Sequence, residues 1–459
     1  MRAGDIRLTW PSRTWEVGGS ADRASKPARA SRVVEEGGED ATLIFGDALD
    51  AAELLMSRGV RAHVVYVDPP YASQADYVAE ARLDGFADGR TRRSVAFNDK
   101  WRGPDGVGAY LDMLAPRLEA AAELLRDDGS LWVHLDWRSA YLVRAILDEI
   151  FGRDAFINEI VWRRAPNLGR QAASAQFGRT LDTILVYGKK DAKITPPTRL
   201  EPIEASAVRV DDAGRAFTTA PRGDYTDASI EKLEREGRVH RTSSGRVYIK
   251  YFLVKDAAGN HFRERRVDAL WTDVSPLRHQ KASERTGYPT QKPVALLDRI
   301  VRCASPPGGV IVDLFSGSGT TAEAAVLAKR RAFASDKSPI AIATARARLL
   351  RAGVAPTIES IGSSENGDLP RGAARAQLDF HEGGTRVILL EPSMPLAWAI
   401  DARGSLARAA FRATWHAERT LGSAPAALPT FVDVRDGKPP IRVRAWADDG
   451  TLFETALSW

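Results

Sequence analysis

The sequence has little of several residue types that would mark particular protein classes. Its 459 residues include a single cysteine, Cys303, which excludes a disulfide within the chain and a cysteine-based zinc site. The seven histidines show no helical His-x3-His spacing. No apolar run approaches the roughly 18 residues of a membrane-spanning helix, and no signal peptide is recognisable. We therefore expect a cytoplasmic protein with no metal centre and no membrane contact.

What the sequence does contain is typical of a globular protein. Hydrophobic residues make up 44% of the chain and charged residues 27%, and the length predicts two or three domains. The net charge of +5 permits an anionic partner without requiring one. Cys303 lies in a predicted helix and His134 in a predicted strand, so we interpret both as core residues.

The stretch from Val64 to Tyr71 is the most informative part of the chain. It reads Val-Val-Tyr-Val-Asp-Pro-Pro-Tyr, which predicts a central strand that the prolines must end. Asp68 then lies at the carboxyl end of the strand, the edge where ligands bind in open α/β sheets. Its carboxylate, the Pro69 carbonyl and the Tyr71 ring could hold a flat base that carries an amino group. The alternative is a strand that simply ends in a proline turn.

A second motif follows the strand predicted at 310–315. Gly317-x-Gly319-x-x-Ala322 opens a helix and fits the glycine pattern of nucleotide-binding units. Asp336 ends the next predicted strand, where a carboxylate can accept both ribose hydroxyls. NAD and S-adenosylmethionine fit this arrangement equally, and a tight turn without a ligand is the third interpretation.

The two motifs together favour methyl transfer. A dehydrogenase gives no reason for an Asp-Pro-Pro-Tyr turn, whereas a methyltransferase must hold a nucleophile in line with the methyl group. An exocyclic amine is a poor nucleophile because its lone pair is conjugated with the ring. If Asp68 and the Pro69 carbonyl accept its hydrogens, the lone pair points at the methyl group and the developing positive charge is stabilised. A base within a duplex must be flipped out to reach these groups.

Composition and hydrophobic period divide the chain into an α/β pattern with an insertion and two ends. The expected segments are a partly flexible extension (1–40, most flexible at about 17–40), a catalytic half (41–162), an inserted region (163–285), a cofactor-binding half (286–351), a linker (352–375) and a small β-rich appendage (376–459).

Two stretches within these segments have a more specific interpretation. Residues 72–108 are polar without a sustained period, which predicts a long loop that acts as a lid or a DNA contact. Between residues 238 and 255, basic residues alternate with aromatic ones, a pattern suited to phosphate contact and base stacking. A solvated β-ribbon with lysine and arginine on its wet face explains the second pattern equally well.

In combination these motifs resemble the β-class amino-methyltransferases of DNA, which act on N6 of adenine or N4 of cytosine. In that family the catalytic motif precedes the glycine motif and the target-recognition region lies between them, as Asp68–Tyr71, 163–285 and Phe315–Gly319 do here. Glu284–Pro293 is similar to the family's segment before the glycine strand. The similarity covers about residues 42–350 and, within the family, is strongest to the modification subunits of type III restriction systems and their solitary relatives. It implies a Rossmann-like S-adenosyl-L-methionine-dependent methyltransferase fold with permuted motif order.

The resemblance also implies roles for residues at matching positions. The catalytic motif would be Asp68, Pro69, Pro70 and Tyr71. The cofactor would be bound by Asp47 near its adenine, Thr290 and Lys292 near its carboxylate, Asp313, Phe315, Gly317, Gly319 and Thr320 along the glycine turn, and Asp336 at its ribose. Leu314 departs from the proline that the family usually has before Phe315.

The partners that the resemblance implies are double-stranded DNA as substrate, with a restriction subunit or a second copy of the chain as protein partners. Aspartate at the first motif position goes mostly with adenine in this family, so Asp68 predicts N6-methyladenine, with N4-methylcytosine as the alternative. Two further alternatives are a non-catalytic DNA-specificity subunit of the same fold and an NAD-dependent oxidoreductase.

Overall fold

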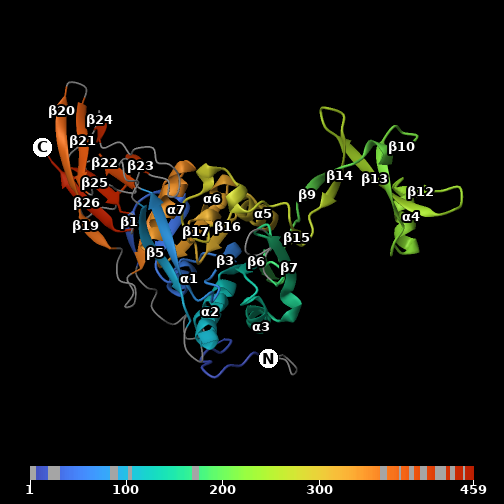
Figure 1. Cartoon of the computed structure of the whole chain (residues 1–459), viewed down its shortest axis with the longest axis horizontal. Coiled ribbons are helices and arrows are strands. Elements are labelled where there is room, and N and C mark those ends of the chain that lie inside the picture. Colours follow the sequence, from blue (N-terminus) through green and yellow to red (C-terminus); the bar gives the residue numbers. More distant parts are fainter. Residues whose placement is uncertain are drawn as a thin grey trace. The chain divides into compact units, whose positions relative to one another are not determined.

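The computed structural model of the chain forms two compact units, one of residues Thr195–Asp268 and one of the remaining residues. Figure 1 labels their elements. The residues that the structure describes are 7–18, 31–82, 91–101, 106–167, 175–361, 370–381, 384–391, 397–403, 411–418, 431–434, 440–447 and 450–458. Within these ranges no helix combines the length and the apolar composition needed to cross a membrane.

A mainly parallel sheet forms the centre of the larger unit. Across the described residues its ten strands are, in spatial order, β1 (Ser31–Glu35), β18 (Pro356–Ile361), β2 (Gly38–Phe45), β17 (Arg331–Asp336), β16 (Val310–Asp313), β3 (Ala62–Val67), β6 (Leu125–Leu135), β8 (Leu181–Gly188), β7 (Phe156–Arg163) and β15 (Leu270–Trp271). The strands from β18 to β6 are parallel, whereas β1 and β8 run antiparallel to their neighbours. The predicted Rossmann-like α/β architecture is confirmed.

Two groups of helices cover the two faces of this sheet (Figure 1). One group contains α1 (Ala48–Ser57), α2 (Gly106–Glu123) and α3 (Ala140–Phe151), and the other contains α5 (Val294–Ala304), α6 (Thr320–Leu327) and α7 (Pro339–Arg351). Leu55 of α1, Leu118 of α2 and Ile146 of α3 are buried in one core cluster with Val65 and Val133 of the sheet. Cys303 is buried in α5, and burial raises the pKa of its thiol to about 12, as expected of a core residue.

The prediction of a long loop over residues 72–108 is wrong for much of this range. Residues after the catalytic motif form a two-stranded antiparallel hairpin of β4 (Ala75–Arg82) and β5 (Thr91–Asp99), while 83–90 and 102–105 lie outside the described residues. The hairpin packs through Ala79 and Ala96, which are small and have little β-propensity, so no strand pattern was visible in the sequence.

Two further expectations at the ends of the α/β domain need correction. The stretch predicted to be flexible at 17–40 contains β1 and the start of β2, while 19–30 lie outside the described residues. The expected linker at 352–375 contains β18, which inserts between β1 and β2. Ile358 and Ile361 of β18 are fully buried, so this short strand is part of the core although half of its residues are polar.

The smaller unit is an antiparallel sheet with one helix packed on it. Its elements are β9 (Thr198–Pro202), β10 (Arg209–Val210), β11 (Ala216–Pro221), α4 (Asp227–Arg235), β12 (Val239–Arg241), β13 (Val247–Lys255) and β14 (His261–Arg266). Ile230 and Leu233 of α4 pack on Ile249 of β13 and enclose a small core. The outer parts of the expected inserted region, β8 and β15, belong instead to the large sheet.

The segment after β18 is rich in strands, as its sequence predicts. Its described strands are β19 (Arg371–Ala373), β20 (Arg375–His381), β21 (Gly384–Glu391), β22 (Ala397–Asp401), β23 (Trp415–Glu418), β24 (Phe431–Val434), β25 (Ile441–Trp446) and β26 (Leu452–Leu457). A buried ion cluster joins this segment to the α/β domain, because Glu35 of β1 binds Arg346 of α7 at 2.8 Å and lies 3.8 Å from Arg444 of β25.

Candidate active site

Four acidic residues follow four neighbouring parallel strands of the large sheet. Asp47 follows β2, Asp336 ends β17, Asp313 ends β16 and Asp68 follows β3. Because β2, β17, β16 and β3 are adjacent and parallel, these carboxylates meet at one edge. After β16 the chain continues to β17, which lies on one side of β16, and after β3 it continues to β6, which lies on the opposite side of β3. The strand order therefore reverses between β16 and β3, and α/β folds bind ligands at such a topological switch point.

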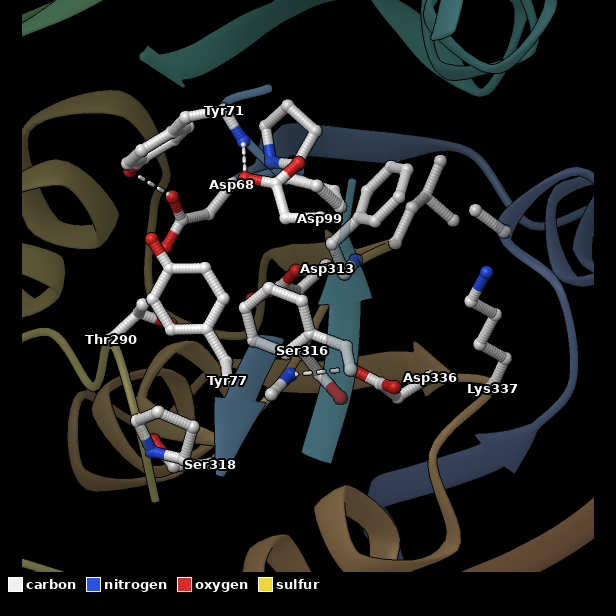
Figure 2. A pocket seen from close by; sticks show the side chains of 18 of the residues that line it. Asp68, Tyr71, Tyr77, Asp99, Thr290, Asp313, Ser316, Ser318, Asp336 and Lys337 are labelled. Carbon is white, nitrogen blue, oxygen red and sulfur yellow. Dashed lines mark hydrogen bonds between the residues drawn. The ribbon is translucent and has the colours of Figure 1, made fainter. Parts of the chain in front are cut away.

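One pocket opens at this edge (Figure 2). It contains about 1140 Å³ of space that protein atoms do not fill, including its solvent-open mouth. The expected residues that line it are Asp47, Asp68, Pro69, Pro70, Tyr71, Thr290, Lys292, Asp313, Phe315, Gly317, Thr320 and Asp336. Gly319 is the one expected residue that does not line the pocket.

The catalytic motif forms a compact hydrogen-bonded group. The Tyr71 hydroxyl donates to Asp68 Oδ1 at 2.5 Å (Figure 2), and the Lys292 ammonium donates to Asp68 Oδ2. Lys292 Nζ also donates to the Tyr71 hydroxyl at 3.0 Å. Burial and the neighbouring Asp68 charge raise the pKa of Tyr71 well above its ordinary value, so its hydroxyl stays protonated. The contact of Lys292 with a cofactor carboxylate stays a prediction, because its ammonium here binds the aspartate.

His134 lies behind this group, where its two ring nitrogens are both occupied. The Tyr66 hydroxyl lies 2.8 Å from His134 Nδ1, and Asp182 lies 3.2 Å from Nε2. The imidazole is fully buried and stacks against the Tyr71 ring at 6.3 Å. Burial opposes ionisation of Asp182, but His134, Lys292 and Arg164 together lower its pKa. The interpretation of His134 as a satisfied core residue is confirmed, and it also supports one face of Tyr71.

The glycine turn after β16 lies against the end of β17. Gly317 has φ 47° and donates its N–H to Asp336 Oδ2 at 2.8 Å, while Ser338 N–H donates to Asp336 Oδ1 at 2.8 Å. Burial raises the pKa of Asp336 despite these bonds. A Cβ at Gly319, by contrast, would lie 2.6 Å from the Cβ of Ala345 in α7. Gly319 therefore allows α6 and α7 to pack closely rather than lining the pocket.

Asp313 lies between the glycine turn and the catalytic motif. Its Oδ1 accepts the Phe315 N–H at 3.0 Å. Burial raises the pKa of its carboxyl to about 7, and the charges of Asp68 and Asp336 act in the same direction. Among the described residues, the buried Ser316 hydroxyl that lines the same pocket has no hydrogen-bond partner. A polar ligand would satisfy it.

Asp47 is held at the far side of the pocket by an ion pair. Arg117 of α2 donates to its two carboxylate oxygens at 3.0 and 2.7 Å, and Leu49 N–H donates at 2.9 Å. Burial opposes ionisation, but Arg117 lowers the pKa of Asp47 overall. Its approach to the cofactor's adenine stays a prediction.

Sequence reasoning missed several residues of this pocket. They come mainly from the β4–β5 hairpin and its ends, and are Tyr77, Phe97, Asn98, Asp99 and Trp101, together with Arg117, Tyr288, Ser316 and Lys337. The rings of Tyr77 and Phe97 stack at 4.6 Å. The sequence offered one signal for the hairpin residues, because their segment follows the Asp68–Tyr71 motif directly and could therefore be expected near the pocket.

The chain is similar to several known proteins. The DNA methylase family N6_N4_Mtase matches residues 62–347. The type II methyltransferase M.EcaI of Enterobacter cloacae is 29% identical over 352 residues, covering 71% of this chain and 72% of that protein. The Mod subunit of the type III restriction-modification enzyme StyLTI, from Salmonella typhimurium, is 25% identical over 325 residues, covering 61% of this chain and 49% of that protein. The crystal structure of the M1.HpyAVI–SAM complex superposes with a TM-score of 0.38 and 16% identity, covering 67% of this chain and 98% of that one.

Proposed function

The chain belongs to the family of DNA methylases that modify N6 or N4 amino groups, and from this membership we propose that it methylates N6 of adenine at a specific DNA sequence. Its cofactor is S-adenosyl-L-methionine. The observation that carries the proposal is the end of β3, where the Asp68 carboxylate meets two hydrogen-bond donors inside the pocket that also contains the glycine turn.

The cofactor half of the pocket fits S-adenosyl-L-methionine in three respects. The absence of a side chain at Gly317 leaves a cradle that a Cβ would fill, because that atom would lie 3.2 Å from the Tyr288 ring. Each Asp336 oxygen accepts one backbone N–H and keeps a lone pair for a ribose hydroxyl. The buried Ser316 hydroxyl lacks a partner among the described residues and would bind a polar atom of the ligand. When bound, S-adenosyl-L-methionine supplies a methyl group on a positively charged sulfur.

The catalytic half of the pocket suits an amine that donates hydrogen bonds. The Lys292 ammonium donates to Asp68 Oδ2, so the carboxylate already accepts hydrogen bonds from a nitrogen. The target amine would likewise donate one hydrogen to this carboxylate and the other to the Pro69 carbonyl. The Tyr71 hydroxyl fixes the other oxygen, so the carboxylate cannot rotate freely. Asp68 would accept the proton that the amine loses after transfer.

The target base would stack on Tyr71 after it leaves the duplex. One face of the Tyr71 ring lies against His134, and the Lys292 ammonium lies 5.3 Å from the ring centre. A base cannot reach a pocket at the edge of a sheet while it remains paired, which supports base flipping. Adenine is favoured over cytosine because a carboxylate at Asp68 accepts strongly and goes mostly with adenine in the family.

The smaller unit supplies surfaces suited to reading DNA. On the face of β13 opposite α4, Lys250 lies 4.9 Å from the ring of Phe217, and Arg215 lies 4.1 Å from that of Phe252. The Arg215 and Lys250 side chains can contact phosphates, and the partly buried Phe252 ring can contact a base, whereas the Phe217 ring is buried. We assign target recognition to residues 163–285, of which Thr195–Asp268 form a compact unit of their own, while β8 and β15 belong to the large sheet. A restriction subunit and a second copy of the chain stay predictions.

The test is to express the protein in a host without DNA methylation and to analyse digested DNA by mass spectrometry. We expect N6-methyladenine, and we expect Asp68→Ala to reduce turnover by at least about a hundredfold, as when a preorganised hydrogen-bonding group is lost. Asp68→Asn keeps the size of the side chain but presents an NH2 group to one of the two donors and cannot accept the proton, so it should be impaired as well. N4-methylcytosine as the product would overturn the choice of adenine, and full methylation by Asp68→Ala would overturn the role of Asp68.

A further inference from the structure

Asp99, the last residue of β5, binds the chain directly after the catalytic motif. Its carboxylate is fully buried and lines the pocket. Three consecutive backbone N–H groups donate to it, those of Tyr71 at 3.1 Å, Ala72 at 3.0 Å and Ser73 at 2.8 Å. The Ser73 hydroxyl at 2.7 Å and the Trp101 indole N–H at 3.0 Å also donate to it. Figure 2 shows Asp99 beside Tyr71.

The two prolines of the motif explain why this turn needs an external anchor. Pro69 and Pro70 have no N–H, so the turn cannot be fixed by backbone donors until Tyr71. The chain then enters the left-handed region at Ala72 (φ 57°) and Gln74 (φ 63°). Residues other than glycine adopt this conformation only where the surroundings hold them in it. Convergence of successive N–H groups on one anion is a known way of holding such a turn.

We propose that Asp99 is a positioning residue for methyl transfer, an inference that rests on the proposed function. It fixes the backbone N–H of Tyr71, whose hydroxyl binds Asp68 and whose ring would stack on the base. Asp99 acts through Tyr71 and needs no contact with the reacting atoms. It also ties the β4–β5 hairpin to the catalytic motif, so the hairpin contributes to the geometry of the site.

The test separates positioning from a purely structural role by measuring turnover per cofactor-binding site. Asp99→Asn keeps the size of the side chain but presents an NH2 group to N–H donors, so the turn should shift. We expect a fall in kcat of between about tenfold and a hundredfold, because small displacements of reacting groups have such effects. Affinity for S-adenosyl-L-methionine should stay at the wild-type value, since Gly317 and Asp336 lie on other elements. Asp76→Asn is the matched control, because Asp76 is on the same hairpin and, among the residues that the structure describes, its carboxylate binds Asn98 and Lys100.

A second variant keeps the test decisive if Asp99→Asn does not fold. Ser73→Ala removes one of the five donors and leaves the backbone N–H groups in place, and it should lower kcat severalfold without changing cofactor affinity. The proposal is overturned if a folded Asp99→Asn protein has the wild-type kcat per cofactor-binding site. If only Ser73→Ala folds, a wild-type kcat in that variant overturns it. Absence of methylation by the wild-type protein would instead overturn the proposed function, so the two failures are distinguishable.

Discussion

Replacing Asp313 by asparagine should remove a pH-dependent penalty on the stability of the protein. Asp313 is buried at the end of β16, and burial raises the pKa of its carboxyl from 3.8 to about 7. Hydrogen bonds from Thr321 and the Phe315 N–H oppose this rise, and the charges of Asp68 and Asp336 add to it. A displacement of about three pH units corresponds to on the order of 4 kcal/mol against ionising the group in the folded state.

The sign of the effect follows from which state holds the proton. Below about pH 3.8 the Asp313 carboxyl is protonated in the folded and the unfolded protein, and no penalty arises. As the pH rises toward about 7, the unfolded chain releases this proton first, so the free energy of unfolding falls. Above about pH 7 the group is ionised in both states and the full penalty is present. Asp313→Asn has no titrating group there, so its stability relative to wild type should rise across this window.

The assay is urea-induced unfolding of wild type and Asp313→Asn without cofactor, at pH values from about 4 to about 8. The difference in unfolding free energy should grow by on the order of 4 kcal/mol in favour of the variant. Thr321→Val removes a hydrogen bond that favours the ionised carboxyl, so it should extend the decline in stability to higher pH and make the total loss larger, while the onset of the decline stays the same. Parallel pH profiles for wild type and Asp313→Asn would refute the assignment of a raised pKa to this residue.

Two further predictions concern the cofactor and the DNA. Asp336→Ala should weaken S-adenosyl-L-methionine binding by roughly 1.5–3 kcal/mol because a charged acceptor is lost, and unchanged affinity by calorimetry would remove Asp336 from the site. Exchange of residues 163–285 with those of a relative should change the methylated sequence and leave cofactor affinity unchanged, and the opposite pattern in sequencing and calorimetry would contradict the assignment.

Much of the site was predictable because its acids follow short apolar runs. Asp68 and Asp313 each come at or just after a β-branched strand, and Asp336 ends the strand that follows the glycine turn. Local sequence therefore places each acid at the carboxyl end of a strand. The order of the strands in the sheet, which makes β17, β16 and β3 neighbours, depends on long-range packing and entered only through the family resemblance.

The parts that were not predictable lack a periodic signal. The β4–β5 hairpin packs through alanines, so neither of its strands shows the alternation of large apolar and polar residues that marks a half-buried strand. β18 is short and half of its residues are polar, so in the sequence only Ile358 and Ile361 indicate its burial. In both cases tertiary packing decided the structure against weak local preferences.

The environment of Asp68 shows why a short motif predicts a candidate catalytic residue but not the residues around it. Tyr71 is three residues away and belongs to the motif, whereas Lys292 reaches the same carboxylate from 224 residues further along the chain. Asp99 accepts the Tyr71 N–H from a strand that the sequence did not reveal. The proposed reaction needs the Asp68 carboxylate to be oriented, paired with donors and held at the pocket, and a different segment would meet each of these requirements. Variation outside the motif can therefore change the rate of methyl transfer while the four motif residues stay the same.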